Sequence, residues 1–211
     1  MNDIKSIRFP PPVADEMVRA ILEDHKTVTR RVVMPQPLRV LNSPYHKQHP
    51  ETPDKVLLER LCMPPYRPGD ILYVRETWRI WRAHRYEADA YIKFKAGGEG
   101  TVLHFPYGGT DSINRKDYDD FIGKWGIGGR WRPSIHMPRE AARIFLRVTD
   151  VRVQQLKDIT DADALQEGFY SRASLVSELL KIYPDLTADS WLWVIEFEQI
   201  SREEAVSRVV L

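Results

Sequence analysis

The sequence contains a single cysteine, Cys62, and no apolar run long enough to cross a membrane. One cysteine cannot form an internal disulfide, and a membrane helix needs about 20 consecutive apolar residues. The 31 lysines and arginines nearly balance the 30 acidic residues, so a formal charge of +1 gives no bulk attraction to nucleic acid or membrane. No secretory leader pattern opens the chain. We therefore expect a soluble, cytoplasmic protein that makes no contact with a membrane.

Metal-binding patterns are also missing. The six histidines are scattered without ligand spacing, and a lone cysteine matches no zinc motif. We therefore predict no metal and no other cofactor. With 43% hydrophobic residues among 211, the chain can form one medium core, and we expect a single domain over residues 1–211.

The expected elements are short and mixed in type. Hydrophobic alternation predicts strands over 6–9, 27–33, 71–78, 91–94, 101–105, 143–153 and 191–200, with a hairpin joining 91–94 to 101–105. Apolar stripes and capping residues predict helices from Pro12 to near Asp24, from Thr160 to Gly168, over 175–183 with Leu175, Val176, Leu179, Leu180 and Tyr183 on one side, and in the tail from Ser201. We interpret the proline-rich residues 35–68 as an irregular excursion and 123–140 as a structured loop. This order favours an α+β fold built on a small mixed β-barrel with helices at its ends.

The stretch HKTVTRRV, residues 25–32, places Lys26 at the joint between a helix and a strand. A lysine withdrawn from solvent beside Arg30 and Arg31 is pushed toward its neutral form and can act as a base. Thr29, three residues on, then becomes a candidate nucleophile. Strict strand alternation would put Lys26 and Thr29 on opposite faces, so this interpretation requires a twist, bulge or turn at the strand entrance. The alternative is an ordinary basic edge strand.

Two glutamates are candidates for the acidic partner. Glu167 sits at the C-terminal end of its predicted helix, where the helix dipole disfavours a carboxylate by about 0.3–1 kcal/mol. Glu76 shares a strand face with apolar neighbours, which indicates either pairing with an arginine or a functional role.

Aromatic and basic residues interleave on both sides of the central part of the sequence. Flat rings beside guanidinium groups suit a nucleobase and its phosphates, each stacked base being worth about 1–3 kcal/mol. Trp78 is more typical of a core residue than of a binding site, and a histidine in a loop is more often held by hydrogen bonds alone. The candidate substrate-binding residues are Arg31, Arg75, Glu76, Trp78, Trp131, Ser134 and His136.

Four segments together resemble the ASCH superfamily, whose barrel is similar to the PUA fold: HKTVTRR, RPGDILYVRETW, ITDADALQEGF and IYPDLTADSWLWVIEFEQI. The family signature of glycine, any residue, lysine, four residues and arginine matches at Lys26 and Arg31, with Asp24 in place of the glycine. The motifs look most like the small bacterial members that hydrolyse the amide of 4-N-acetylcytidine. Their lysine, threonine and glutamate correspond to Lys26, Thr29 and Glu167, which the resemblance implies are catalytic.

The resemblance covers about half of the chain, roughly residues 4–34, 66–78 and 143–200. Residues 35–65 and 79–142 are two long insertions without a counterpart in the small enzymes. Over its whole length the chain looks more like longer ASCH proteins of phages and prophages. The fold is therefore expected more firmly than the chemistry.

Three functions fit these patterns. The first is an amide hydrolase acting on 4-N-acylated cytosine, in which Lys26 activates either Thr29 or water, Glu167 orients the lysine or protonates the leaving amine, and Arg31 or a backbone amide stabilises the oxyanion. The second is a binding module for RNA or modified nucleic acid without turnover. The third is a ribonuclease. The expected partner is a nucleoside or a single-stranded nucleic acid, and neither the natural substrate nor the oligomeric state follows from the sequence.

Overall fold

The computed structural model describes residues 4–105 and 112–207. Its strands are β1 (Lys5–Arg8), β2 (Val28–Val32), β3 (Ile71–Arg75), β4 (Trp78–His84), β5 (Asp89–Phe94), β6 (Thr101–His104), β7 (Phe145–Gln155) and β8 (Trp191–Ile200). Its α-helices are α1 (Ala14–Leu22), α2 (Leu38–Leu41), α3 (Pro44–Gln48), α4 (Asp54–Leu61), α5 (Ser112–Trp125), α6 (Asp161–Gln166), α7 (Arg172–Ile182) and α8 (Arg202–Ser207). Short 3₁₀ helices occupy Ser134–His136, Arg139–Ala141 and Leu156–Asp158. None of the helices in the described residues is long and apolar enough to span a bilayer.

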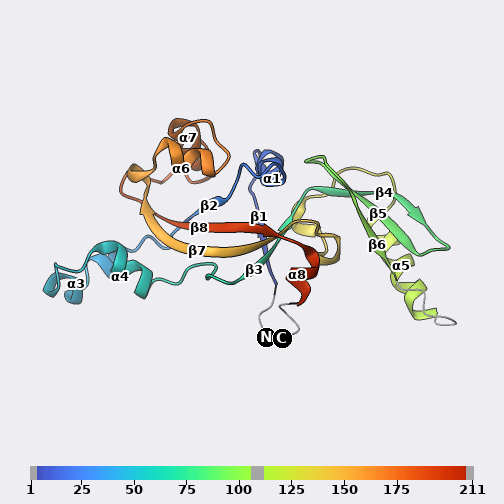
Figure 1. Cartoon of the computed structure of the whole chain (residues 1–211), viewed down its shortest axis with the longest axis horizontal. Helices are drawn as coiled ribbons and strands as arrows, with labels where there is room; N and C mark the ends of the chain where they lie inside the picture. The colour runs from blue at the N-terminus through green and yellow to red at the C-terminus, as the bar shows by residue number, and fades with distance from the viewer. Residues whose placement is uncertain (1–3, 106–111, 208–211) are drawn as a thin grey trace.

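Two sheets organise this α+β fold. The larger has the strand order β1-β3-β7-β8-β2, in which β1 runs parallel to β3 and the other neighbours are antiparallel. The smaller is the antiparallel sheet β4-β5-β6. Figure 1 shows the long β7–β8 pair at the centre, with α1, α6 and α7 on one side of it and the smaller sheet beyond one end.

The larger sheet has two edges, β1 and β2. Among the described strands, no ladder of hydrogen bonds joins these edges, so closure of the expected small mixed barrel is not shown. A side chain connects them instead: Nη2 of Arg31, on β2, donates a hydrogen bond of 2.9 Å to the carbonyl oxygen of Arg8, on β1.

Separate apolar clusters hold the layers together. One joins α1 to the large sheet through residues such as Met17, Ile21 and Ile195. Another packs α6 and α7 against β8 and includes Leu175 and Leu192. Burial of these side chains fixes the positions of α1 and α6, and the candidate site lies where the two helices approach β2.

Several expected elements are confirmed. The last strand covers the predicted residues 191–200, and the hairpin of β5 and β6 forms. Thr160 caps α6 through a reciprocal pair of hydrogen bonds with Asp163, and Gly168 follows the helix with a left-handed φ of 86°.

Other expectations were wrong. Residues 35–68 contain the three helices α2, α3 and α4 instead of an irregular excursion, and α5 was not predicted. The strand predicted over 71–78 ends at Arg75, and Trp78 begins β4 in the other sheet. The buried face of α7 carries Leu175, Glu178 and Leu179, whereas Leu180 is 37% exposed. The prediction placed Leu180 on the buried face because the charged Glu178 was not expected there.

The turn between α1 and β2 depends on a left-handed residue. Asp24 has φ of 56°, the conformation that glycine adopts at least cost, and its side chain is exposed. We expect Asp24→Gly to raise the free energy of unfolding by about 0.5–1 kcal/mol, because strain in the folded state is relieved and partly offset by a more flexible unfolded chain. Urea denaturation measures this change. Asp24→Ala is the control and should be no more stable than the original protein; equal stabilisation by both substitutions would contradict the strain argument.

Candidate functional site

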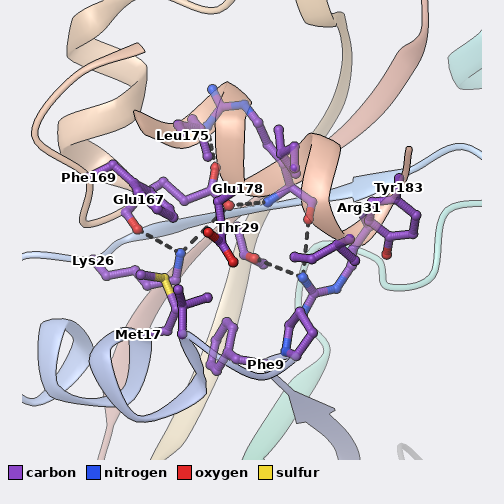
Figure 2. Close-up of a pocket in the computed structure, with 15 residues that line it drawn as sticks. Phe9, Met17, Lys26, Thr29, Arg31, Glu167, Phe169, Leu175, Glu178 and Tyr183 are labelled. Carbon is purple, nitrogen blue, oxygen red and sulfur yellow. Dashed lines mark hydrogen bonds and ion pairs between the residues drawn. The ribbon is translucent and has the colours of Figure 1, made fainter. Parts of the chain in front are cut away.

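The segment that enters β2 and the end of α6 are joined by their backbones. Lys26 and Glu167 form an isolated β-bridge, and the Thr27 amide donates to the Gln166 carbonyl at 2.9 Å. A Cβ on Gly168 would lie 3.0 Å from the Cβ of Ala20, so α6 approaches α1 closely at this point. Residues 141 positions apart thus share one site, which Figure 2 shows.

Lys26 is buried, with 3% of its surface exposed. Its Nζ donates to the carbonyl oxygens of Val28 at 2.7 Å and Glu167 at 3.0 Å, and it lies 3.7 Å from Oε1 of Glu167. Burial lowers the pKa of Lys26 to about 8, the Glu167 carboxylate opposes this shift, and the nearby charges of Arg31 and Arg30 add to it. Lys26 can therefore lose its proton near neutral pH, as the sequence predicted for a buried lysine beside other cations.

The Glu167 carboxylate is occupied by Arg30. Oε1 accepts from the Arg30 backbone amide at 2.7 Å, and Oε2 accepts from Nη1 of Arg30, also at 2.7 Å. The same guanidinium donates to Asp163 at 2.6 Å and to Gln154 at 3.0 Å. Both oxygens of the carboxylate therefore already accept charge-assisted bonds, and this arrangement is suited to orienting Lys26.

Thr29 shares the site with Lys26 for a simple reason of chain geometry. β2 begins at Val28, so Lys26 lies in the bridged segment before the strand, and strand alternation does not apply to the pair. Thr29 is 1% exposed, and its Oγ1 accepts a hydrogen bond of 3.3 Å from Nη1 of Arg31. Within the part of the chain that the structure describes, Lys26 and Thr29 form no hydrogen bond with each other.

Lys26, Thr29 and Glu167 line one pocket with Arg31. Its other walls are mainly apolar and come from α1, α7 and the segments beside them: Phe9, Pro10, Val13, Met17, Phe169, Leu175, Leu179, Ile182 and Tyr183. The cationic groups of Lys26 and Arg31 lie 5.4 and 5.6 Å from the centre of the Phe9 ring. The cavity of about 40 Å³ holds only a few water molecules, so a ring-sized ligand requires side chains at its rim to move.

Arg75, Glu76 and Trp78 lie outside this pocket. Glu76 is buried and forms a two-pronged ion pair with Arg143, at 2.7 and 2.9 Å, which is the structural alternative that the sequence left open. Trp78 is fully buried in the core of the smaller sheet, so its expected contact with substrate was wrong. The Arg75 guanidinium lies 5.7 Å from the ring centre of Tyr73.

The remaining candidates gather at a different place. Trp131 and His136 line a more open pocket of about 480 Å³ with Trp125, Arg130, Arg132 and Pro133. Ser134 lies in the 3₁₀ helix between Pro133 and His136 but not in the wall of the pocket. This second pocket shares no residue with the pocket that contains Lys26.

Two residues of the site were not among the expected site residues. Arg30 was noted only as a neighbouring cation, because its partners lie 124 to 137 positions away along the chain. Glu178 also lines the pocket of Lys26. Its signal was present in the sequence, since a glutamate three positions after Leu175 falls on the apolar face of the helix.

Metal ligands do not cluster in residues 4–105 and 112–207, where no group of three or more histidine, cysteine, aspartate or glutamate side chains could hold an ion.

No protein-family model and no curated protein matches the sequence. Among solved structures, the chain is similar to protein EF3133 from Enterococcus faecalis V583, whose crystal structure is assigned to the family DUF984. The alignment has a TM-score of 0.44 and 11% identity, and it covers 97% of this chain and 82% of that chain. The second match, with a TM-score of 0.45 and 10% identity, covers 95% of this chain and 81% of the other, and it is to the high-resolution crystal structure of an ASCH domain from Lactobacillus crispatus JV V101.

Proposed function

We propose that the pocket around Lys26 binds a 4-N-acylated cytosine and hydrolyses its amide bond. The observation that carries this proposal is a lysine with its pKa lowered to about 8, buried against Glu167 in a pocket that Thr29 and Arg31 also line. Enzymes use lysines of this kind as bases near neutral pH. The apolar walls suit the flat face of a base, and the motifs shared with the small 4-N-acetylcytidine hydrolases suggest the acylated amine as the reacting group.

In the proposed reaction, neutral Lys26 takes a proton from water, whose oxygen adds to the acyl carbonyl. The Arg31 guanidinium and the Thr29 hydroxyl, 3.3 Å apart, stabilise the negative charge on the carbonyl oxygen. The bond between carbon and nitrogen then breaks, and the Lys26 ammonium returns its proton to the departing amine. The products are cytidine and the free acid; Lys26 is neutral again once it has protonated the amine, and the acid releases its own proton to solvent.

Water is preferred to Thr29 as the nucleophile because of the hydrogen bonds at the site. A hydroxyl nucleophile needs a base within hydrogen-bond reach, whereas the Lys26 amine donates to two carbonyls and the Thr29 hydroxyl faces Arg31. Glu167 has the role of positioning Lys26 and does not transfer a proton, since both of its carboxylate oxygens already accept hydrogen bonds from Arg30.

We also infer that residues 1–211 form one domain and that the larger sheet is an incomplete PUA-like barrel. The core cluster around Trp78 supports the first inference, because it joins Ile80 and Ile92 of the smaller sheet to Phe145 and Ile200 of the larger one. The hydrogen bond between Arg31 and the Arg8 carbonyl supports the second, since it bridges the two edge strands at the gap.

Incubation with 4-N-acetylcytidine tests the hydrolase directly, with cytidine and acetate measured by chromatography. We expect turnover, a loss of about 10²–10³-fold in kcat with Thr29→Val if its hydroxyl stabilises the oxyanion, and a clear loss with Glu167→Gln. Complete inactivity of Thr29→Val, together with a burst of acylated enzyme in the original protein, would make Thr29 the nucleophile instead. Full activity of either variant would remove that residue from the mechanism.

A second candidate function rests on the pocket of Trp125, Arg130, Trp131 and Arg132. Indole rings beside guanidinium groups can stack single-stranded bases and neutralise phosphates, which suits a binding module for RNA. Labelled single-stranded RNA in the same assay separates the possibilities. Retention that weakens steeply with salt, without free cytidine, would support binding alone, and cut strands would indicate a ribonuclease.

A further inference from the structure

Glu178 presents an unusual carboxylate inside the pocket of Lys26. It lies on α7, is 6% exposed, and lines the pocket together with Lys26 and Thr29. Figure 2 shows its side chain directed toward the polar part of the pocket. The partners of its two oxygens differ: Oε2 accepts from Lys181 at 3.0 Å, whereas Oε1 is buried without a hydrogen-bond partner among the described residues.

An unpaired carboxylate oxygen is costly to bury, because it loses water and gains no donor in return. Lys181 does not remove this cost, since its own side chain is 65% exposed and it reaches only Oε2. The neighbouring positions on the same helix face, Leu175 and Leu179, are apolar. A leucine at position 178 would therefore suit the fold better, and a carboxylate there is explained by a donor that a ligand brings.

We propose that Glu178 is a specificity residue that accepts a hydrogen bond from the exocyclic N–H of the acylated base. This inference rests on the proposed function. A 4-N-acylated cytosine keeps one hydrogen on the nitrogen of its amide, and a carboxylate acceptor binds that hydrogen. A base with two substituents on the same nitrogen has no hydrogen to donate, so the buried oxygen would remain unpaired in its complex.

The other charged groups of the pocket cannot perform this recognition. Arg31 can only donate, the lone pair of neutral Lys26 is used to take the proton of water, and the Glu167 oxygens are already held by Arg30. Glu178 is thus the acidic residue of this pocket that retains an unused acceptor, in the part of the chain that the structure describes. Its role is to bind and orient the substrate nitrogen, while Lys26 moves the protons.

The experiment compares 4-N-acetylcytidine with 4-N-acetyl-4-N-methylcytidine, in which a methyl group replaces the hydrogen on the amide nitrogen. We expect the original protein to prefer the first substrate by at least tenfold in kcat/KM. Glu178→Leu should lose at least tenfold in kcat/KM on the first substrate, and its preference between the two should fall toward one. Glu178→Gln keeps an acceptor oxygen and should retain most of the preference. Ser177→Leu, an exposed change on the same helix, serves as the control and should leave both rates unchanged.

The temperature of thermal unfolding separates a ligand-binding role of Glu178 from a purely structural one, because the two roles predict changes of opposite sign in Glu178→Leu. If the carboxylate serves a ligand, Glu178→Leu should unfold at a higher temperature than the original protein while it is less active. An unchanged preference in Glu178→Leu, or a lowered unfolding temperature, would overturn the role of Glu178 and leave the hydrolase standing. Absence of hydrolysis of either substrate by the original protein would overturn both.

Discussion

Lys26→Met is expected to lower hydrolysis of 4-N-acetylcytidine by about 10²–10⁴-fold, the usual contribution of a general base. Methionine has a similar length and suits the buried, largely apolar surroundings, so the variant should fold. Loss of activity in a folded variant would therefore reflect loss of the amine. Circular dichroism verifies the fold, and release of cytidine measures the rate.

The pH dependence of the rate follows from the pKa of Lys26, which is lowered to about 8. Only the neutral amine accepts a proton, and at pH 7 about one tenth of the molecules carry it in that form. We expect kcat/KM to rise roughly tenfold per pH unit below 8 and to level off above it. Lys26→Arg is the matched control, since it keeps the positive charge but cannot release a proton in this range. Appreciable activity in Lys26→Arg would show that charge, and not base catalysis, is what the site requires.

The pH dependence of the free energy of unfolding provides an independent measure of the lowered pKa of Lys26. The folded state releases the Lys26 proton near pH 8, whereas the unfolded chain holds it to about 10.5, so the unfolded state binds more protons between these values. The cost of burying the charged amine is fully present below pH 8 and disappears as the pH rises to 10.5. Relative to Lys26→Met, the original protein should therefore gain roughly 3 kcal/mol across this window.

Arg30→Met is expected to reduce the free energy of unfolding by about 3–5 kcal/mol, as measured by urea denaturation. The Arg30 side chain is fully buried and donates to Glu167, Asp163 and Gln154. Its removal leaves Asp163 without its cationic partner and leaves Glu167, deep in the site, with only the more distant Lys26 at 3.7 Å. Activity should fall as well, because the Glu167 carboxylate would keep the bond from the backbone amide of residue 30 but lose the guanidinium that holds Oε2.

A surface pair of similar composition provides the control. Arg152 pairs with Glu196 and Asp150, but its side chain is 29% exposed. Water compensates for the loss of such a pair, so Arg152→Met should cost about 1 kcal/mol or less. Similar destabilisation by the two substitutions would contradict the role of burial in the Arg30 network.

The parts of the fold that could be predicted from the sequence are those with strong local signals. The final strand combines β-branched and aromatic residues, and α6 begins with Thr160 and ends before Gly168. The position of Lys26 at the joint of a helix and a strand also followed from local pattern. Its convergence with Thr29 and Glu167 was expected from the resemblance to known hydrolases, not from the pattern of residues.

The parts that could not be predicted depend on distant contacts. At the break between β3 and β4, Glu76 pairs with Arg143, 67 residues later, a partner that the alternating pattern does not reveal. Helix α5 has a weak apolar stripe and contains Gly123 close to its end, so its local signal is poor. The bonds of Arg30 likewise depend on three partners more than 120 residues away.

The backbone bridge between Lys26 and Glu167 has a consequence for motion. The amine bonds to the carbonyl of the residue whose carboxylate orients it, and the adjoining Thr27 amide is tied to Gln166. If α6 moved relative to β2, these bonds would carry the proposed base Lys26 and the Glu167 carboxylate together. The entrance of the pocket could therefore widen to admit a ligand without separating Lys26 from Glu167.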